Sequence, residues 1–331
     1  MTAFVCPKCR AALEQDDGGY RCDSCARSYP ILFDIPDFRL GGDQYLTLDE
    51  ERAKAARLHA YALDHDFREL VAFYYSITDD VPEQLAPIFA DYAVNAPARA
   101  APAIEALAQA GSAGAFLDLG CGSGGALVAA QDRFRDRTGI DIALRWLVIA
   151  QKRLEEAGVA AQLVCADAEA LPFAESAFNH VLAADLLENS LSPAAAIKGA
   201  AAVMAEGGHL FLTSSNGRWI GPHPATGVWA AGLQPPRLRE ALLKRRHGVD
   251  LLRGVSFVSA GSVRRTTAAA GLRQLDARPL ELAPGALEHR SALFKTLGRA
   301  YAMLARAPVV RAVLLIAGPV FQSLYAKEKT S

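Results

Sequence analysis

The stretch Phe116-Leu-Asp-Leu-Gly-Cys-Gly-Ser-Gly-Gly125 decides the fold of this 331-residue chain. Its apolar residues predict a strand, and an acid-x-Gly-x-Gly-x-Gly turn follows. Glycines lack β-carbons, so backbone N–H groups in such a turn can approach a ligand and the next helix can pack closely. The dinucleotide fingerprint is spaced GxGxxG, whereas here the third glycine comes one residue early. The stretch therefore predicts a strand that feeds a nucleotide-binding turn, with an ordinary tight turn as the alternative.

Apolar strands alternate with amphipathic helices around this turn, which is typical of a parallel sheet covered by helices on both faces. We expect strands at 115–119, 137–140, 162–165, 178–184, 206–213, 272–280 and 320–327. We expect helices between about 48 and 110, and at 124–133, 143–157, 193–204, 237–246, 259–270, 286–305 and 309–317. The expected fold class is α/β, with a Rossmann-like, seven-stranded, doubly wound sheet.

Acidic residues stand at the ends of four of these strands: Asp118, Asp141, Asp167 and Asp185. Asp141 comes 17 residues after Gly124, where one helix and one further strand would place it. Each acid alone could be a helix cap. Acids at successive strand ends instead favour one shared binding site, because parallel strands end at the same edge of a sheet.

Two CxxC pairs lie near the N-terminus: Cys6-Pro-Lys-Cys9 and, twelve residues later, Cys22-Asp-Ser-Cys25. Two such pairs on tight turns place four thiolates at the corners of a tetrahedron, as structural zinc requires. Disulfides are the alternative, but no secretion signal is recognisable in MTAFVCPKCR, which disfavours them. Four protein ligands leave Zn²⁺ no open position, so we expect a structural or recognition role for it.

The glycine turn and the acids after it resemble class I S-adenosylmethionine (SAM) methyltransferases, with a methyltransferase type 11-like domain over about 115–216. The resemblance implies the cofactor SAM and a last strand that runs antiparallel. It implies that Asp141 accepts hydrogen bonds from the ribose hydroxyls and that Asp118 orients the loop or the SAM ammonium group. The full set of implied cofactor-binding residues is Asp118, Gly120, Cys121, Gly122, Gly124, Asp141, Ile142, Asp167, Ala168 and Asp185.

The cysteine module resembles a zinc ribbon, similar to the methyltransferase-activating ribbon proteins, and implies Zn²⁺ on Cys6, Cys9, Cys22 and Cys25. Gly41-Gly42 marks a boundary after it. We expect three units: a zinc ribbon at 1–40, a helical linker or cap at 41–110, and a methyltransferase domain at 111–331. A helical insertion at about 286–317 precedes the last strand of the third unit.

The candidate catalytic residues are His223, Glu188 and Asp185, in that order. A base is needed only when the methyl acceptor must lose a proton. His223 follows the fifth strand in a Gly- and Pro-rich loop, at the rim where ligands bind in open α/β sheets. A surface histidine in a turn is the alternative for His223.

Charge is divided unevenly along the chain. The net charge is only −1, but the part from Arg237 onward holds 17 Lys and Arg against 6 Asp and Glu. This excess indicates either a contact with a membrane surface or nucleic acid, or a solvated helix surface. A face that could dock on lipid or cover the core is formed by Leu293, Phe294, Leu297, Tyr301 and Leu304.

The expected function is SAM-dependent methyl transfer to oxygen or carbon of a small-molecule or lipid-like acceptor, because the 286–317 insertion is apolar. One alternative is an RNA guanine methyltransferase that uses the ribbon and the basic C-terminal third. Another is a non-catalytic SAM-binding partner protein. The longest apolar run, Ala312–Phe321, is shorter than the about 20 residues that span a bilayer. We expect a cytoplasmic protein with an additional peripheral membrane contact; the oligomeric state is not predicted.

Overall fold

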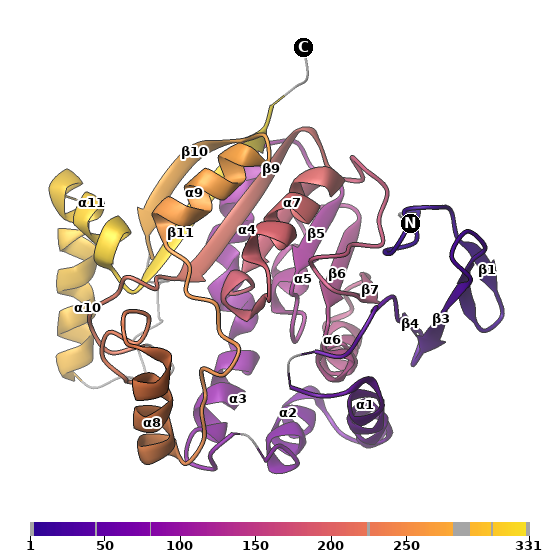
Figure 1. Ribbon diagram of the computed structural model, residues 1–331, viewed down its shortest axis with the longest axis horizontal. Helices are drawn as coiled ribbons and strands as arrows, with labels where there is room; N and C mark the ends of the chain where they lie inside the picture. The colour runs from indigo at the N-terminus through magenta and orange to yellow at the C-terminus, as the bar shows by residue number, and fades with distance from the viewer. Residues whose placement is uncertain are drawn as a thin grey trace.

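Two β-sheets and a set of surrounding helices make up the part of the chain that the computed structural model describes (Figure 1). That part comprises residues 3–43, 45–79, 81–223, 226–280, 292–305 and 307–328. None of its helices combines the length and the apolarity needed to cross a membrane.

The smaller sheet is antiparallel, with the strand order β1-β2-β3-β4. Its strands are β1 (Glu14–Asp16), β2 (Gly19–Cys22), β3 (Arg27–Leu32) and β4 (Ile35–Pro36). The turn between β1 and β2 is held by the Asp16 side chain, whose Oδ1 accepts hydrogen bonds of 2.9 Å from the backbone N–H groups of Gly18 and Gly19. An aspartate that accepts from the backbone two residues on is a common device for reversing the chain.

Four helices occupy the stretch expected to be helical between 48 and 110: α1 (Leu48–Ala62), α2 (Phe67–Ser76), α3 (Ala86–Val94) and α4 (Ala96–Ala110). The break between α1 and α2 has a local cause. Asp66 and Glu69 form a capping box in which each side chain accepts from the other residue's backbone N–H. A capping box starts a new helix, so the sequence stretch cannot continue as one.

The larger sheet has seven strands in the order β10-β11-β9-β8-β5-β6-β7. They are β5 (Phe116–Leu119), β6 (Arg137–Asp141), β7 (Gln162–Cys165), β8 (Phe178–Ala184), β9 (Met204–Ser215), β10 (Leu272–Pro279) and β11 (Val320–Lys327). The pairs from β7 through β9 are parallel, and β11 is antiparallel to β9 and β10. The expected seven-stranded α/β sheet with an antiparallel last strand is confirmed.

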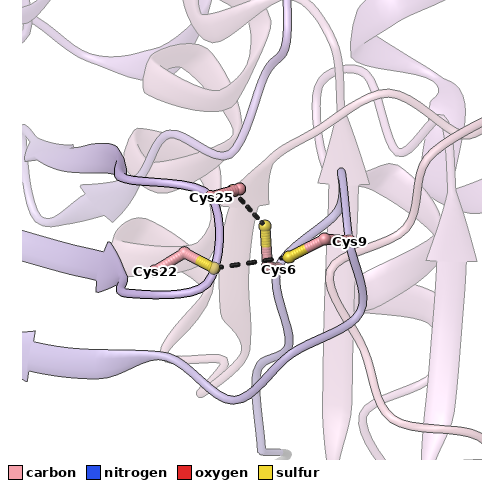
Figure 2. A group of neighbouring side chains, drawn as sticks. All are labelled: Cys6, Cys9, Cys22 and Cys25. Atoms are coloured by element: carbon pink, nitrogen blue, oxygen red, sulfur yellow. Dashed lines mark hydrogen bonds between the residues drawn. The ribbon is translucent and has the colours of Figure 1, made fainter.

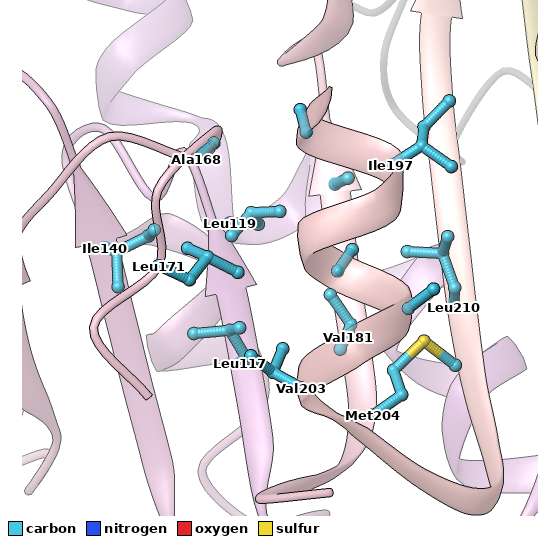
Figure 3. Packing of buried hydrophobic residues seen from close by; sticks show 14 of the residues in the cluster. Leu117, Leu119, Ile140, Ala168, Leu171, Val181, Ile197, Val203, Met204 and Leu210 are labelled. Atoms are coloured by element: carbon cyan, nitrogen blue, oxygen red, sulfur yellow. The ribbon is translucent and has the colours of Figure 1, made fainter. Parts of the chain in front are cut away.

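Helices cover both faces of this sheet, so all four residues of β5 are buried. Phe116 belongs to one hydrophobic cluster with Leu127 of α5 (Gly125–Ala129) and Leu147 of α6 (Leu144–Ala157). Figure 3 shows the other face, where Leu117, Val181 and Leu210 of the sheet lie beside α7 (Pro193–Val203). Because strand side chains alternate between faces, a strand covered on both sides has no face exposed to solvent, and even Asp118 of β5 is buried.

The remaining elements connect and flank the sheet: a short 3-10 helix (Leu187–Asn189), α8 (Pro236–His247), α9 (Ala260–Ala269), α10 (Ala292–Leu304) and α11 (Pro308–Ala317). The helix expected at 124–133 is shorter than predicted, because α5 ends at Ala129. Of the apolar face expected on α10, only Tyr301 has a described side chain, whose hydroxyl donates to the Leu280 carbonyl at 3.1 Å. The side chains of Leu293, Phe294, Leu297 and Leu304, and residues 286–291, lie outside the described part.

The small sheet docks on the β7 edge of the large one. The Phe38 N–H donates to the Cys165 carbonyl at 2.7 Å, and Asp37 forms a parallel bridge with Cys165. The Arg10 guanidinium donates to the carbonyls of Leu171 and Phe173, at 2.6 Å each. The two sheets therefore share backbone hydrogen bonds and one hydrophobic cluster. The division of the chain into units at 40 and 110 stays a prediction.

Candidate cofactor, acceptor and metal sites

The glycine turn after β5 has the backbone that its composition predicts. Gly120, Gly122 and Gly124 have φ angles of +80°, +48° and +74°, in the left-handed region that side chains rarely adopt. A β-carbon on Gly120 would also lie 2.9 Å from Cδ1 of Leu186. The turn thus presents bare backbone at the carboxyl end of β5.

Asp141, at the end of β6, is tied to this turn. Its carboxylate accepts hydrogen bonds of 2.9 Å from the backbone N–H groups of Gly122 and Ala143. Loss of solvent around the carboxyl group raises the pKa of Asp141, against the opposite effect of these two donors. Asp141 therefore joins the glycine turn to the start of α6.

Asp118 is a buried carboxyl group, 3% exposed, in the middle of the same site. Burial and the neighbouring charge of Asp141 raise the pKa of Asp118 to about 7. Among the described residues no hydrogen bond reaches its carboxyl oxygens. A buried carboxylate without a donor is costly, and a cation at this point would relieve that cost.

The remaining residues expected around the cofactor follow β6 and β7. Asp167 accepts a hydrogen bond of 2.9 Å from the Glu169 N–H, so its carboxylate caps the local turn. Ala168 is buried next to it. Cys121 is buried, and a β-carbon on Gly139 would lie 2.9 Å from its sulfur, so Cys121 fills the space between the turn and β6.

A buried ion pair connects the small sheet to this edge, and the sequence analysis missed it. Arg39 donates from Nε and Nη2 to the two carboxylate oxygens of Asp37, at 2.8 Å each. Its Nη1 donates to the Ile142 carbonyl at 3.3 Å, directly after Asp141. Arg52 of α1 adds a contact of 3.4 Å to Asp37. Apart from an ordinary Asp-x-Arg, nothing in the local sequence distinguishes this pair.

A second buried pair holds α1 against the first turn of α6. Glu51, 1% exposed, accepts a 2.8 Å hydrogen bond from the Arg145 N–H and pairs with the Arg145 guanidinium. The same guanidinium contacts Asp43 at 3.0 Å. The segment that leads from the small sheet into α1 is thus anchored at Ile142 and Arg145, directly after Asp141.

The acceptor side begins at the end of β8. Asp185 has a φ angle of +53°, and its carboxylate accepts from the Tyr92 hydroxyl of α3 at 2.5 Å and from the Thr213 hydroxyl at 3.4 Å. Tyr92 is a contact that the sequence analysis missed, because α3 is distant in sequence and an isolated tyrosine carries no motif. The hydrogen bond places α3 next to the β8 end of the site.

Glu188 lies one turn further on and is buried. Its carboxylate accepts from the Ser214 hydroxyl at 2.6 Å and from the Ser215 N–H at 3.1 Å. Burial and the negative charge of Asp185 raise the pKa of Glu188 to about 7. The structure therefore brings two of the three candidate catalytic residues, Asp185 and Glu188, together beside the end of β9.

His223 has other contacts than Asp185 and Glu188. Its backbone N–H donates to the Val228 carbonyl at 2.8 Å, and among the described residues no hydrogen bond reaches its buried Nδ1. Burial and the positive charge of Arg239 lower the pKa of His223. Within the described residues, no hydrogen bond or ion pair joins His223 to Asp185 or Glu188.

The four cysteines of the small sheet converge on one point (Figure 2). Their sulfur atoms all lie within 4.8 Å of one another, with Cys6 and Cys25 at 3.6 Å and Cys9 and Cys22 at 3.4 Å. Tetrahedral zinc with bonds of about 2.3 Å separates its sulfur ligands by roughly 3.8 Å. The Tyr29 hydroxyl lies 3.2 Å from the Cys6 sulfur, where it can donate a hydrogen bond to a metal-bound thiolate. This cluster can hold a tetrahedral metal ion.

Comparison with known protein families gives a match in the middle of the chain. Residues 117–212 match the family described as "Methyltransferase domain". The matched segment contains Asp118, Asp141, Asp167, Asp185 and Glu188, and leaves out the cysteine cluster and His223. The central segment is therefore similar to methyltransferase domains. No curated protein matches the chain in sequence.

Solved structures with a similar fold include the [4+2]-cyclase SpnF. The match has 20% sequence identity, covers 70% of this chain and 81% of that chain, and has a TM-score of 0.47. A SAM-dependent methyltransferase from Mesorhizobium loti matches at 17% sequence identity and a TM-score of 0.46, over 68% of this chain and 96% of that chain. Geranyl diphosphate C-methyltransferase from Streptomyces coelicolor A3(2) matches at 18% identity, 68% of this chain, 78% of that chain and a TM-score of 0.45. Likeness at this level says nothing about activity or acceptor.

Proposed function

We propose that this protein transfers a methyl group from SAM to oxygen or carbon of a small-molecule or lipid-like acceptor. One observation carries the proposal. Asp118, Asp141, Asp167 and Asp185 stand at the carboxyl ends of the adjacent strands β5, β6, β7 and β8, around a glycine turn of bare backbone. Ligands of open α/β sheets bind at this edge. The match of residues 117–212 to methyltransferase domains supports the same reaction.

The residues at this edge fit SAM as a cofactor. The Asp118 carboxyl group is buried and lacks a donor among the described residues, so it can receive an ammonium group. Gly120, Gly122 and Gly124 leave room for a ligand against the backbone, and Asp141 and Asp167 offer carboxylates for hydroxyl and amino donors. When bound, SAM supplies a methyl group on a positively charged sulfur. The chain has to align the acceptor and exclude water.

Glu188 is the base that the geometry favours for an acceptor that must lose a proton. Because the pKa of Glu188 is raised to about 7, the carboxylate is present near neutral pH and can still take up a proton. The hydrogen bonds from Ser214 and Ser215 fix its orientation. Asp185 and His223 remain further candidates, and for His223 the proposal rests on its place in the loop after β9.

Zinc, held by Cys6, Cys9, Cys22 and Cys25, completes the proposed cofactor set. Four thiolate ligands leave no position for substrate, so the metal stabilises the small sheet and takes no part in the chemistry. Since this sheet carries Asp37 and Arg39 to the Ile142 carbonyl, its folding also supports the cofactor edge.

Calorimetric titration with SAM tests the site. The change Asp141→Ala should abolish detectable binding, whereas Asp132→Ala, at an exposed loop position, should leave it unchanged. Wild-type affinity in the Asp141 variant would refute the site. Transfer of tritium from labelled SAM into fractionated lipid, RNA and protein pools of the source cell then identifies the acceptor class.

Label in RNA would favour the alternative of an RNA guanine methyltransferase, which the 17 Lys and Arg against 6 Asp and Glu beyond residue 236 motivate. SAM binding without transfer to any pool would favour a non-catalytic partner protein. A cytoplasmic location with peripheral membrane contact remains a prediction from the sequence.

A further inference from the structure

A small outer unit lies between β9 and α9, formed by residues 217–223 and 226–258 and including α8. It has its own hydrophobic cluster, made by Val228, Ala231, Leu243 and Leu252. The unit contains seven Lys and Arg against two Asp and Glu. It is therefore a folded, basic appendage of the sheet.

This outer unit exposes large apolar side chains that its own cluster leaves uncovered. Trp229 is 66% exposed and Leu233 is 57% exposed. Their sequence neighbours Val228 and Ala231 are buried in the cluster. Other exposed members are Ile220, Leu238 and Leu242. Single exposed apolar residues are ordinary, but a gathering of them marks an interaction surface.

Helix α8 shows the same feature in a regular geometry. Leu238 and Leu242 are exposed one turn apart and share one side of the helix, turned by about 100° to 140° from the fully buried Leu243. The exposed Arg245 and Arg246 stand one turn further along the same side. Surface helices typically place charged or polar residues on the side that faces solvent. The solvent face of α8 thus combines leucines with a cationic rim.

Helix α11 adds a second apolar face. Val309, Val313 and Ile316, spaced three to four residues apart, are 77%, 57% and 61% exposed. The charged residue of this helix, Arg311, is bound to Asp276 at 2.7 Å and to the Ala277 carbonyl at 2.9 Å. Figure 1 shows α11 beside the β10 edge of the sheet and α8 below it, both at the left of the view.

We propose that the outer unit, together with α11, docks this protein on an anionic membrane surface. Leucine, valine, isoleucine and tryptophan side chains gain by entering the interface of a bilayer, and the arginines beside them pair with anionic headgroups. The excess of seven cationic over two anionic side chains in the unit complements such a surface. RNA would bind to the cations and stack its bases on aromatic rings, but exposed aliphatic side chains make no favourable contact of this kind with it.

The proposed docking surface is joined to the acceptor side of the sheet. The Ser256 N–H donates to the Glu188 carbonyl at 2.7 Å, and the Ser256 hydroxyl donates to the Ser190 carbonyl at 2.9 Å. The outer unit is therefore tied to the segment that carries Glu188, which suits an acceptor taken from the membrane. Only this last step rests on the proposed function; the docking itself does not.

The test is co-sedimentation of the whole protein with vesicles, without SAM. Vesicles of phosphatidylcholine mixed with phosphatidylglycerol should bind the protein, more weakly as salt is added, and pure phosphatidylcholine should bind far less. Two double variants separate the contributions, Leu238→Gln with Leu242→Gln and Arg245→Gln with Arg246→Gln. Each should lower binding about tenfold or more. These four positions are exposed, so the variants should fold as the wild type does.

The matched control is Leu63→Gln with Arg135→Gln, at exposed positions outside the proposed surface. It should bind vesicles like the wild type. Equal vesicle binding by all variants would overturn the proposal, as would RNA binding with a steep salt dependence and no vesicle binding. Because SAM titration reports on the methyltransferase site separately, a failure of docking is distinguishable from a failure of the proposed function.

Discussion

The Tyr92 hydroxyl donates a hydrogen bond of 2.5 Å to the Asp185 carboxylate, and these residues are 93 positions apart. The bond ties α3 to the end of β8. The Arg99 guanidinium lies over the Tyr92 ring, 3.2 Å from its centroid. A helix that precedes the sheet in sequence is thereby held at the edge where the candidate site lies.

Changing Tyr92→Phe should loosen α3 without unfolding the protein. The ring that contacts Arg99 is kept, and only the hydrogen bond is lost, so we expect at most about 1 kcal/mol of destabilisation. Backbone amide exchange should become faster in Ala86–Val94 and stay unchanged in Phe67–Ser76, which serves as the internal control. Unchanged exchange in α3 would show that Tyr92 does not hold it.

Changing Asp118→Asn should stabilise the protein at pH 8 and weaken SAM binding. The pKa of Asp118 is about 7 in the fold, because of burial and the charge of Asp141, and about 4 in the unfolded chain. The fold therefore binds this proton more tightly, and its stability falls as pH rises from about 4 to 7. Asparagine cannot ionise, so the gain should be about 2 to 4 kcal/mol at pH 8 and smaller at pH 5.

Urea unfolding at both pH values checks this expectation for Asp118, with the exposed Asp136→Asn as the control. An equal change in stability at pH 5 and pH 8 would contradict it. The accompanying loss of SAM affinity, measured by calorimetry, distinguishes a residue kept for binding from one kept for packing.

Changing Glu188→Gln should lower turnover of a hydroxyl acceptor by about 10²- to 10⁴-fold. Glutamine has nearly the same shape, and its oxygen can accept from the Ser215 N–H while its amide group donates to the Ser214 hydroxyl, so SAM affinity should be unchanged. The pH–rate profile of the wild type should rise through about pH 7, where Glu188 loses its proton, and this limb should disappear in the variant. A retained limb, or the same loss in the exposed Glu175→Gln, would reject Glu188 as the base.

Changing Arg39→Met should destabilise the protein by about 3 to 5 kcal/mol, because it leaves the buried Asp37 carboxylate without its main partner. The double change Asp37→Leu with Arg39→Met should cost less, since no buried charge remains. The measurement is urea unfolding of both single variants and the double variant. The exposed pair Arg133 and Glu105 is the matched control and should contribute less than about 1 kcal/mol. If the two changes lowered the free energy of unfolding additively, Asp37 and Arg39 would not be coupled.

Removal of metal should unfold the small sheet and break its hydrogen bond to β7. Elemental analysis should find zinc in the wild type and in Cys121→Ala, but none in Cys22→Ser. In the metal-free protein the Phe38 amide, which donates to the Cys165 carbonyl, should exchange faster. A folded wild-type protein that contains no metal would contradict a zinc site.

Much of the sheet was predictable because each of its signals is local. The strands Gln162–Cys165, Phe178–Ala184 and Val320–Lys327 have the predicted bounds, since short apolar runs between polar turns allow little else. The acids at the strand ends were predictable for the same reason. Helix boundaries were less so, as α5 shows: it ends at Ala129, where an expected further turn does not form.

The glycine turn Phe116–Gly125, the two CxxC pairs and the order of strands and helices were determined by the sequence itself, because backbone freedom, ligand spacing and hydrophobic period act over a few residues. Only the tertiary structure decided that Asp37 and Arg39 reach the Ile142 carbonyl, and that Tyr92 meets Asp185. It also decided that Leu238 and Leu242 of α8 are exposed while Leu243 is buried. Such contacts depend on how distant segments pack, and no local pattern in the chain encodes that packing.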